Sequence, residues 1–413
     1  MVGAGVAGLS AALELAERGR KVLVHEMAPG AGGRCRSFAD TKLGRSLDNG
    51  NHLILSGNHA VLAVLDRIGA RERWIEVAPA RFPFLDVRSA TAWRFAPSPG
   101  LWQGWIFSKH RRVPDTGPTD YLALVKFLFA GADATVEDVV PRRSALHHSL
   151  IEPLCLAVLN AAPAQGAAGL MGRVIRETIL RGERFCRPLI AREGLGHGLI
   201  DPLTHHLRTL GAEIAFGQRL RAIEFDETTA RRLLFRDGDV ELDNGDRVVL
   251  ATPPAVTAKL VDGLDVPLDQ SAILNLHFLA DTDRLDQDAP FLGLIGSKAQ
   301  WLFWREGLIS VTISAADDAL MGLPDPDLAA MIWAEINRAL DLGVEAVPPC
   351  RVVRERRATF HQTPPALKSR PEPATRYTNL MLGGDWTDTG LPATIEGAVR
   401  SGRTAANAVL RSV

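Results

Sequence analysis

Val2-Gly3-Ala4-Gly5-Val6-Ala7-Gly8 opens the chain and decides its fold. Its glycines have the G-x-G-x-x-G spacing: the first permits a tight strand-to-helix turn, the second admits a phosphate, and the third lets helix pack on strand. The pattern that follows predicts a helix over residues 10–19 and a strand over residues 21–26. The N–H groups at the helix start can bind phosphate, and an acid at the end of the second strand can bind ribose. We therefore expect a Rossmann-like α/β domain whose dinucleotide contacts are Gly3, Gly5, Val6, Ala7, Gly8, Glu26 and Met27.

A second glycine-rich loop follows in Pro29-Gly30-Ala31-Gly32-Gly33-Arg34-Cys35-Arg36-Ser37. Glycines let the backbone pass close to a phosphate, and a permanently charged arginine can neutralise it. Nicotinamide-dependent enzymes do not need this loop. It resembles the glutathione-reductase-like FAD proteins, in particular the flavin amine oxidase and phytoene desaturase superfamily. The resemblance implies a non-covalent FAD cofactor contacted by Gly32, Gly33 and Arg34.

Length and composition exclude several classes of protein. A chain of 413 residues exceeds what one core usually organises, so two interlocked domains are expected. A formal net charge of −1 shows no excess of positive charge with which to bind nucleic acid. The four scattered cysteines lack metal-type spacing, which predicts free thiols, a cytoplasmic location and no metal site. The most apolar stretches, residues 122–132 and 154–164, are too short to span a bilayer.

The first strand is unusually short. Only Met1 and Val2 precede the first glycine, whereas a buried strand usually needs about five residues. We expect that residues encoded upstream would complete this strand and raise both stability and FAD retention.

Residues 45–52, Arg-Ser-Leu-Asp-Asn-Gly-Asn-His, predict a strand that ends in a polar turn. In the resembling superfamily this turn runs along the flavin ring. Asn49, Gly50, Asn51 and His52 are therefore candidates for contact with the cofactor. His52 is also a candidate catalytic residue, although a solvated turn histidine is equally consistent with the sequence.

Eight aromatic residues gather within residues 74–107, and Lys109-His110-Arg111-Arg112 follow them. Aromatic side chains beside a basic cluster suit a membrane–water interface. They also suit a lid over an apolar pocket, and the sequence leaves both alternatives open. The first alternative predicts peripheral contact with the inner face of the cell membrane.

The pattern of helices and strands in the rest of the chain predicts how it divides into two domains. Residues 121–131, 144–161 and 167–181 have helical spacing and predict a helical, aromatic-rich cap, whereas alternating strands near residues 213–254 return to the first domain. We expect a discontinuous FAD-binding domain of residues 1–85, 191–260 and 351–413. An interleaved α+β substrate domain comprises residues 86–190 and 261–350. By resemblance, Leu220 meets the adenine, while Ala251, Thr252 and Pro253 close on the cofactor.

The C-terminal region carries a second signature. Leu380-Met381-Leu382-Gly383-Gly384-Asp385 predicts a strand, after which Asp385 can accept hydrogen bonds from the ribityl chain. Ala393-Thr394-Ile395-Glu396-Gly397-Ala398 then begins the last helix, whose N–H groups can stabilise negative charge on a reduced flavin. Further cofactor contacts are therefore expected at Gly384, Asp385, Thr394, Ile395 and Ala398.

Longer stretches of sequence point to one family within this superfamily. The sequence is similar to the hydroxysqualene dehydroxylase family of bacterial hopanoid pathways in residues 32–37, 48–52, 357–364 and 384–398. The resemblance implies an oxidoreductase that removes the hydroxyl of hydroxysqualene to give squalene, by loss of water and hydride transfer from reduced flavin. It also implies an apolar C30 isoprenoid substrate and the squalene and hydroxysqualene synthase enzymes as upstream partners. Only one dinucleotide fingerprint is present, so an external electron donor is expected.

The reaction needs an acid and an apolar, aromatic site. His52, Asp388 and Glu177 are the candidate acids, and the sequence does not separate them; an ion pair with Arg176 is an alternative role for Glu177. Trp301 and Phe303, with Trp304, are candidates to stabilise the allylic cation through their aromatic faces.

Two other activities share this architecture. A carotenoid-type (phytoene) desaturase would use a similar cap in the oxidative direction. A flavin amine oxidase typically carries a lysine near the flavin, and the strand at residues 272–279 has none.

Overall fold

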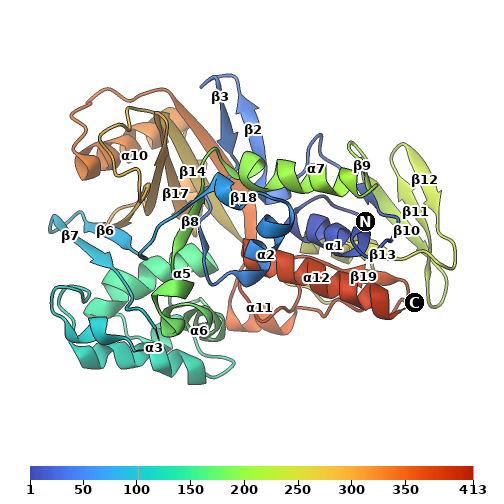
Figure 1. Ribbon diagram of the computed structural model, residues 1–413, viewed down its shortest axis with the longest axis horizontal. Coiled ribbons are helices and arrows are strands. Elements are labelled where there is room, and N and C mark those ends of the chain that lie inside the picture. The colour runs from blue at the N-terminus through green and yellow to red at the C-terminus, as the bar shows by residue number, and fades with distance from the viewer. Residues whose placement is uncertain (101, 413) are drawn as a thin grey trace.

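The computed structural model describes residues 1–100 and 102–412 (Figure 1). The parallel sheet that the opening motif predicts is present. Its strands run in the order β9 (Glu213–Ala215), β1 (Leu23–His25), Val2, β13 (Val248–Leu250) and β19 (Leu380–Leu382). Val2 forms parallel bridges with both His25 and Leu250, so a single residue joins the two halves of the sheet.

This sheet is the middle of three layers. Val24, Val249 and Met381 pack with helices on one face: α1 (Val6–Ala16), α2 (His59–Arg67), α7 (Asp201–Thr209) and α12 (Ile395–Arg411). Val2, Leu250 and Leu382 alternate to the other face. There they pack on an antiparallel sheet of β10 (Leu220–Phe225), β11 (Ala230–Phe235) and β12 (Gly238–Glu241). Figure 1 shows both chain ends within this half of the molecule.

The second domain is built on a seven-stranded sheet. Its strands, in spatial order, are β18 (Cys350–Phe360), β14 (Gln270–Leu279), β17 (Leu308–Ser314), β16 (Trp301–Arg305), β15 (Phe291–Ile295), β6 (Phe82–Asp86) and β7 (Thr91–Phe95). The strands β16 and β17 form an antiparallel hairpin, and the helix α10 (Asp325–Leu340) lies beyond them in the chain. Leu276, Val311 and Leu302 face α10 and form a core with Ile332 and Trp333.

The opposite side of this sheet meets a helical cap. The cap contains α3 (Leu122–Lys126), α4 (Val136–Val139), α5 (Glu152–Leu159) and α6 (Ala168–Glu177), with a π-helical turn at His147–Ile151. Phe84, Phe291 and Trp301 from the sheet share one core with Leu150 and Met171 of the cap.

The remaining elements connect these parts. The strands are β2 (Ser37–Asp40), β3 (Arg45–Asp48), β4 (Ile54–Leu55), β5 (Trp74–Glu76) and β8 (Pro188–Ala191), and the helices are α8 (Pro254–Leu260), α9 (Asp318–Gly322) and α11 (Pro364–Lys368). The strand β2 pairs with β3, while β8 pairs with both β4 and β5.

Strand pairing corrects three of the expected domain limits. The limit at residue 85 cuts through β6, which pairs with β15 of the second sheet. The limit at residue 190 cuts through β8, which pairs with strands from residues 54–76. The limit at residue 350 assigns β18 to the first domain, but β18 pairs with β14. Hydrogen-bond partners far away in sequence decide these limits, so local composition missed them.

Candidate functional site

The opening glycines differ sharply in the space around them. A Cβ on Gly3 would lie 2.5 Å from the Ala251 carbonyl oxygen, and one on Gly8 would lie 2.0 Å from the Gly3 carbonyl oxygen. A Cβ on Gly5, just before Val6 and Ala7 begin α1, would meet no atom within 4 Å. Gly3 and Gly8 therefore serve the packing of strand and helix, whereas Gly5 borders free space where a ligand fits.

The second glycine loop lies against the first. Gly5 and Gly32 form a parallel bridge, and the Gly32 N–H donates to the Ala4 carbonyl at 2.8 Å. Gly32 and Gly33 both have positive φ, 104° and 57°, which favours glycine. The two loops thus form one wall of backbone beside the start of α1.

Glu26 closes β1 at the same end of the sheet. Its carboxylate accepts the Ala4 N–H and the Ala28 N–H, each at 2.7 Å. These bonds hold the carboxylate next to the glycine turn, where a ribose-binding acid is expected. Met27 beside it is exposed. Leu220 begins β10, close to Gln218, whose N–H donates to the Glu26 carbonyl.

Arg34 reaches the other end of the chain. Its Nη2 donates to Asp385 Oδ1 at 2.7 Å, and its Nη1 donates to the Ala358 carbonyl at 2.6 Å. Burial acts to lower the pKa of Arg34, but the Asp385 carboxylate outweighs it and the pKa is raised. The guanidinium and the carboxylate, both expected to contact FAD, are therefore held together as an ion pair.

The turn containing Gly384 is locked onto the last helix. Its N–H donates to Ser401 Oγ at 2.8 Å, and Thr387 Oγ1 lies 2.7 Å from the same hydroxyl. Thr394 caps α12, accepting the Gly397 N–H at 3.1 Å. Ile395 and Ala398, both buried, lie in the first turn of this helix. Its free N–H groups and dipole give the site a positive end.

The turn at residues 251–253, where the chain returns to the first domain, lies beside Gly3 and Gly8. Ala251 packs against both Gly3 and Gly8, and the Thr252 carbonyl accepts the Trp386 indole N–H at 3.0 Å. Pro253 then precedes α8. The expected closing turn thus joins the first and last glycine segments of the domain.

The polar turn at residues 49–52 is tied to the second domain. Asn51 Nδ2 donates to Thr312 Oγ1 at 3.0 Å, and Thr312 Oγ1 donates to Asn275 Oδ1 at 2.9 Å. Asn275 Nδ2 in turn donates to the Asn49 carbonyl at 3.2 Å. A Cβ on Gly50 would lie 3.4 Å from Asn275 and 3.6 Å from His52 Nε2. The expected flavin-ring turn is therefore fixed against the substrate sheet.

One face of the substrate sheet is polar on β14 and β17 and aromatic on β16, β15 and β6. Asn275 pairs with Thr312 and His277 pairs with Ser310, so polar side chains line β14 and β17. Thr312 and Ser310 pair in turn with Trp301 and Phe303 of β16, and the same face continues to Phe291 and Phe84. Trp301 and Phe84 pack edge to face with their ring centroids 5.4 Å apart. Trp304 points to the opposite core, so only two of the three expected aromatics line this face.

The structure separates the three candidate acids. Burial lowers the pKa of His52 to about 4, so its imidazole is neutral at pH 7. Glu177 accepts from Arg400 at 2.7 Å and from Arg173 at 2.7 Å, not from Arg176. Burial acts to raise the pKa of Glu177, but these arginines outweigh it and hold the group ionised.

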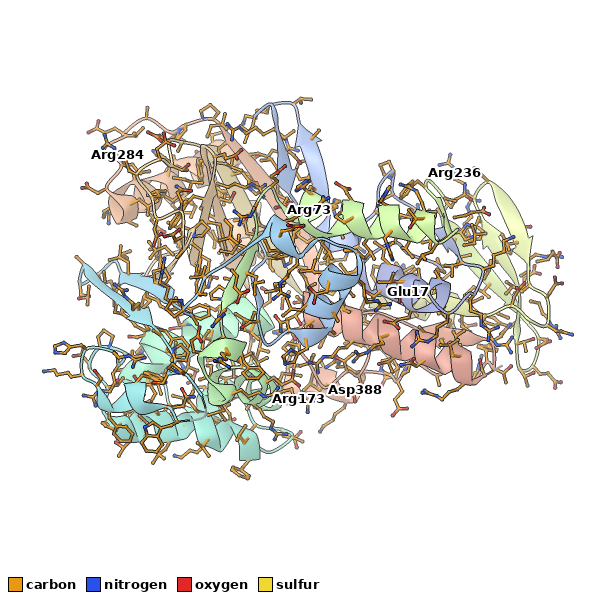
Figure 2. The ribbon with its side chains drawn as sticks, viewed as in Figure 1. Glu17, Arg73, Arg173, Arg236, Arg284 and Asp388 are labelled. Carbon is orange, nitrogen blue, oxygen red and sulfur yellow. The ribbon has the colours of Figure 1, made fainter. Side chains whose placement is uncertain are left out.

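The side chain of Asp388 faces solvent, and its role as a catalytic residue stays a prediction. Its side chain is exposed and Oδ1 accepts the Gly390 N–H at 3.1 Å (Figure 2). The loop turns so that Trp386 and Thr387 point inward instead.

Sequence reasoning missed several buried polar residues of the site. Arg370 donates to the carbonyls of Asp385, Trp386, Thr387 and Leu391, which fixes the loop after the Gly-Asp turn. Gln362 links the Ala393 N–H to the Leu159 carbonyl in the cap. Glu396 caps α2 through the N–H groups of Ala60 and Val61. Their partners lie in distant segments, so no local pattern marks these residues.

These residues fit a flavin dinucleotide. Free space borders Gly5, the Glu26 carboxylate accepts the N–H of Ala4 beside it, and the first turn of α12 leaves N–H groups free for a ligand. Asn49 Oδ1, buried at the polar turn, accepts no hydrogen bond within the described residues. An unpaired buried acceptor is costly unless a ligand satisfies it.

Comparison with known proteins also indicates a flavin-binding protein. The family model described as flavin containing amine oxidoreductase matches residues 6–283 and 285–410. The chain is 44% identical over 412 residues to a hydroxysqualene dehydroxylase of Rhodopseudomonas palustris, with 99% of this chain and 97% of that protein covered. It is 42% identical over 410 residues to a hydroxysqualene dehydroxylase of Sinorhizobium fredii, with the same coverage.

A solved structure of putrescine oxidase bound to putrescine superposes with a TM-score of 0.72 at 16% identity, covering 99% of this chain and 98% of that one. This likeness confirms the expected Rossmann-like fold with a second, interleaved domain. The chain therefore belongs to the flavin-containing amine oxidoreductase family and, within it, groups with the hydroxysqualene dehydroxylases.

Proposed function

We propose that the chain binds FAD non-covalently and reduces hydroxysqualene to squalene. The observation that carries the proposal is the agreement with hydroxysqualene dehydroxylases over nearly the full chain. The geometry supports it, because the expected flavin turn is hydrogen-bonded to a sheet face that becomes aromatic toward the cap. Such a face suits a long apolar substrate better than a charged amine.

The state of the cysteines supports the proposal of non-covalent binding. All four are free and buried, and burial raises the pKa of each thiol to about 12. Since the thiolate is the reactive form, none is poised to attach to a flavin ring. Acid precipitation should release the flavin into the supernatant; flavin retained in the washed pellet would contradict this assignment.

The cofactor, two aromatic residues and the cap would each contribute to the reaction. Reduced FAD, as FADH2, would supply both the hydride that replaces the hydroxyl group and the proton with which the hydroxyl leaves as water. Trp301 and Phe303 present their rings on the face where an allylic cation would lie, and such faces stabilise cations. The cap excludes water that would otherwise recapture the cation.

His52 is the remaining candidate for contact with the leaving hydroxyl. Its ring lies beside Gly50 and Asn275, at the junction of the flavin turn and the substrate sheet. Because burial lowers its pKa to about 4, we assign it the role of a neutral hydrogen-bond donor to the hydroxyl, not that of an imidazolium acid. Asp388 is too exposed for this role and Glu177 is ionised.

The cap also offers a surface for the membrane that dissolves such a substrate. Trp102 is 75% exposed and Phe129 is 82% exposed, with Phe107 and Leu122 also exposed. Trp105 and Tyr121 pack 4.8 Å apart, which brings the two segments together. Basic residues follow at Lys109, Arg111 and Arg112. We propose that this surface contacts anionic lipid; no helix of the described chain is long and apolar enough to cross a bilayer.

The test of the activity is anaerobic incubation of photoreduced protein with hydroxysqualene, followed by product analysis. Squalene is the expected product. Formation of a desaturated polyene from phytoene by the oxidised protein, without squalene formation, would instead support the desaturase alternative. We also propose an external electron donor and the synthase enzymes as partners. Pull-down with the flavin-loaded protein, followed by assays of the captured fraction for reductase and synthase activity, tests both.

A further inference from the structure

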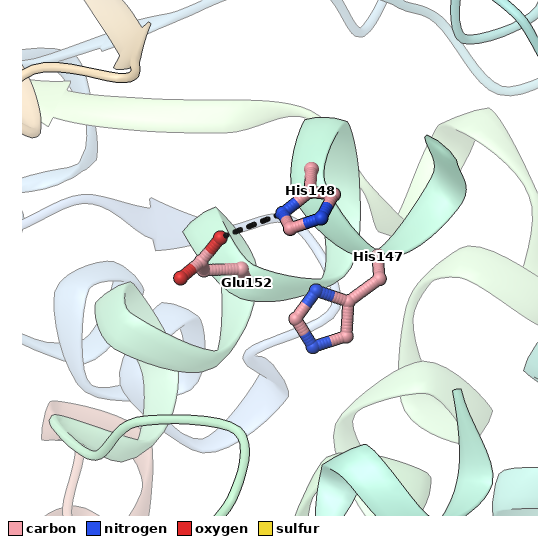
Figure 3. A group of neighbouring side chains, drawn as sticks. All are labelled: His147, His148 and Glu152. Atoms are coloured by element: carbon pink, nitrogen blue, oxygen red, sulfur yellow. Dashed lines mark ion pairs between the residues drawn. The ribbon is translucent and has the colours of Figure 1, made fainter. Parts of the chain in front are cut away.

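The helical cap holds a group of side chains that the reaction does not use. His147 and His148 lie in the π-helical turn His147–Ile151, and Glu152 begins α5 directly after it. One donor atom from each residue can be chosen so that all three lie within 4.8 Å of one another. Figure 3 shows the three side chains side by side, with Glu152 reaching toward His148.

The π-helical turn explains why three residues so close in sequence converge. In an α-helix, a residue lies over the one four positions earlier. In a π-turn the hydrogen bond runs to the fifth residue, so residue i+5 is also brought near residue i. Glu152 is at i+4 from His148 and at i+5 from His147, and the widened turn lets it approach both. Such turns occur frequently at functional sites.

His147 lacks a partner inside the protein. Its side chain is buried, and neither ring nitrogen has a hydrogen-bond partner among the described residues. A buried polar group in this condition is unfavourable unless a ligand satisfies it.

The spacing fits a tetrahedral ion. His148 Nδ1 and Glu152 Oε2 are 3.5 Å apart, which is long for a hydrogen bond. Two ligands of tetrahedral zinc are separated by roughly 3.4 Å, given Zn–N and Zn–O bonds of about 2.0–2.1 Å. The donor atom of His147 lies within 4.8 Å of both. Two imidazoles and one carboxylate form a ligand set typical of zinc.

We propose that His147, His148 and Glu152 bind one zinc ion, with water as the remaining ligand. The ion satisfies His147 and fixes the π-helical turn of the cap. This site is independent of the flavin and of the proposed reaction, since its residues lie in the cap and not among the glycine turns.

The test is zinc binding to the flavin-loaded protein prepared without a polyhistidine tag and treated with chelator. Calorimetric titration with Zn²⁺ should give one ion per chain with a micromolar or tighter Kd. His148→Gln and Glu152→Gln change half-exposed side chains, so both should fold normally and each weaken binding at least tenfold. Substitution of the exposed His205 on α7 by Gln serves as the matched control and should leave the Kd unchanged.

Two outcomes would overturn the proposal. One is a wild-type protein that binds no zinc or binds it only at millimolar concentration. The other is equal binding by wild type and both variants. Binding of Co²⁺ in place of zinc gives a second measurement: a visible absorption band typical of tetrahedral cobalt should appear in the wild type and be lost in His148→Gln.

Discussion

Arg34 and Asp385 lie at opposite ends of the chain, and their side chains form an ion pair at 2.7 Å. The pair joins the second glycine loop to the turn that precedes the last helix. Asp385 is almost fully buried and therefore depends on the guanidinium for compensation of its charge. The two cofactor signatures are thus one structural unit.

Replacing Arg34 by Gln should weaken this unit. We expect a loss of about 1–3 kcal/mol in the free energy of unfolding, because a buried carboxylate loses its charged partner. Flavin content after gel filtration should fall as well. Arg20→Gln, at an exposed position beyond α1, is the control and should change neither quantity. Full flavin content in Arg34→Gln would contradict the assigned role.

Alanine at Gly5 and at Gly8 should separate binding from folding. A Cβ at Gly5 has open space and an ordinary φ of −73°, so the flavin-free protein should lose less than about 1 kcal/mol. Its flavin affinity should nevertheless drop at least tenfold, since the methyl enters the phosphate space. A Cβ at Gly8 collides with the Gly3 carbonyl, and we expect a loss of about 3 kcal/mol or more.

Measuring Tm without flavin and flavin affinity for both variants distinguishes these effects. Gly5→Ala with unchanged flavin affinity would show that the dinucleotide does not lie beside this glycine.

How much the sequence predicts depends on whether the signal is local. The glycine spacing at Gly3, Gly5 and Gly8 correctly predicts the turn and the neighbouring parallel strands, because the whole requirement is written in seven residues. Long-range polar contacts leave no such pattern: Asn275 and Arg370 look like ordinary strand and loop residues until their partners fold against them.

The same limit applies to the expected site residue Asp388 and to the domain limits. Asp388 follows a cofactor signature closely, yet one loop residue can point inward and the next outward. The domain limits failed because β6 and β18 find partners far away in the chain.

Thr312→Val should uncouple the flavin turn from the substrate sheet. The substitution keeps the shape of the side chain but removes the hydroxyl between Asn51 and Asn275. We expect a loss of about 1–3 kcal/mol for the unpaired amides and a several-fold slower formation of squalene, with flavin still bound. An unchanged rate would show that this hydrogen-bond chain does not position the turn.

Acid should destabilise the protein through its buried histidines. Burial, helped by Arg305, lowers the pKa of His277 to about 4, whereas an unfolded histidine titrates at about 6.5. The unfolded chain therefore binds more protons between these values. Stability from neutral His277 is fully present above pH 6.5 and is lost as pH falls toward 4, by about 1–2 kcal/mol at pH 5.

Unfolding measured at pH 7.5 and pH 5 should show this loss in the wild type and a smaller one in His277→Gln. His110→Gln, an exposed control, should behave as the wild type. An equal acid loss in His277→Gln would assign the effect to other groups.

The cap surface predicts binding to anionic vesicles. Co-sedimentation should fall at least fivefold in a Trp102→Ser, Phe129→Ser double variant, because both rings are exposed and available to the interface. Leu268→Ser removes another exposed apolar side chain, outside the cap, and serves as the control. The buried Trp105 is unsuitable for this test, since its loss would disturb the cap core. Equal sedimentation of all proteins would rule out this surface.

The expected reaction is oxidation of the bound reduced flavin by hydroxysqualene. Its most direct test is a single turnover without oxygen: photoreduced protein is mixed with hydroxysqualene while the flavin absorbance and the products are followed together. We expect oxidised flavin to reappear and one squalene to form per flavin, with His52→Gln slower than the wild type. A flavin that stays reduced, with no squalene formed, would contradict it.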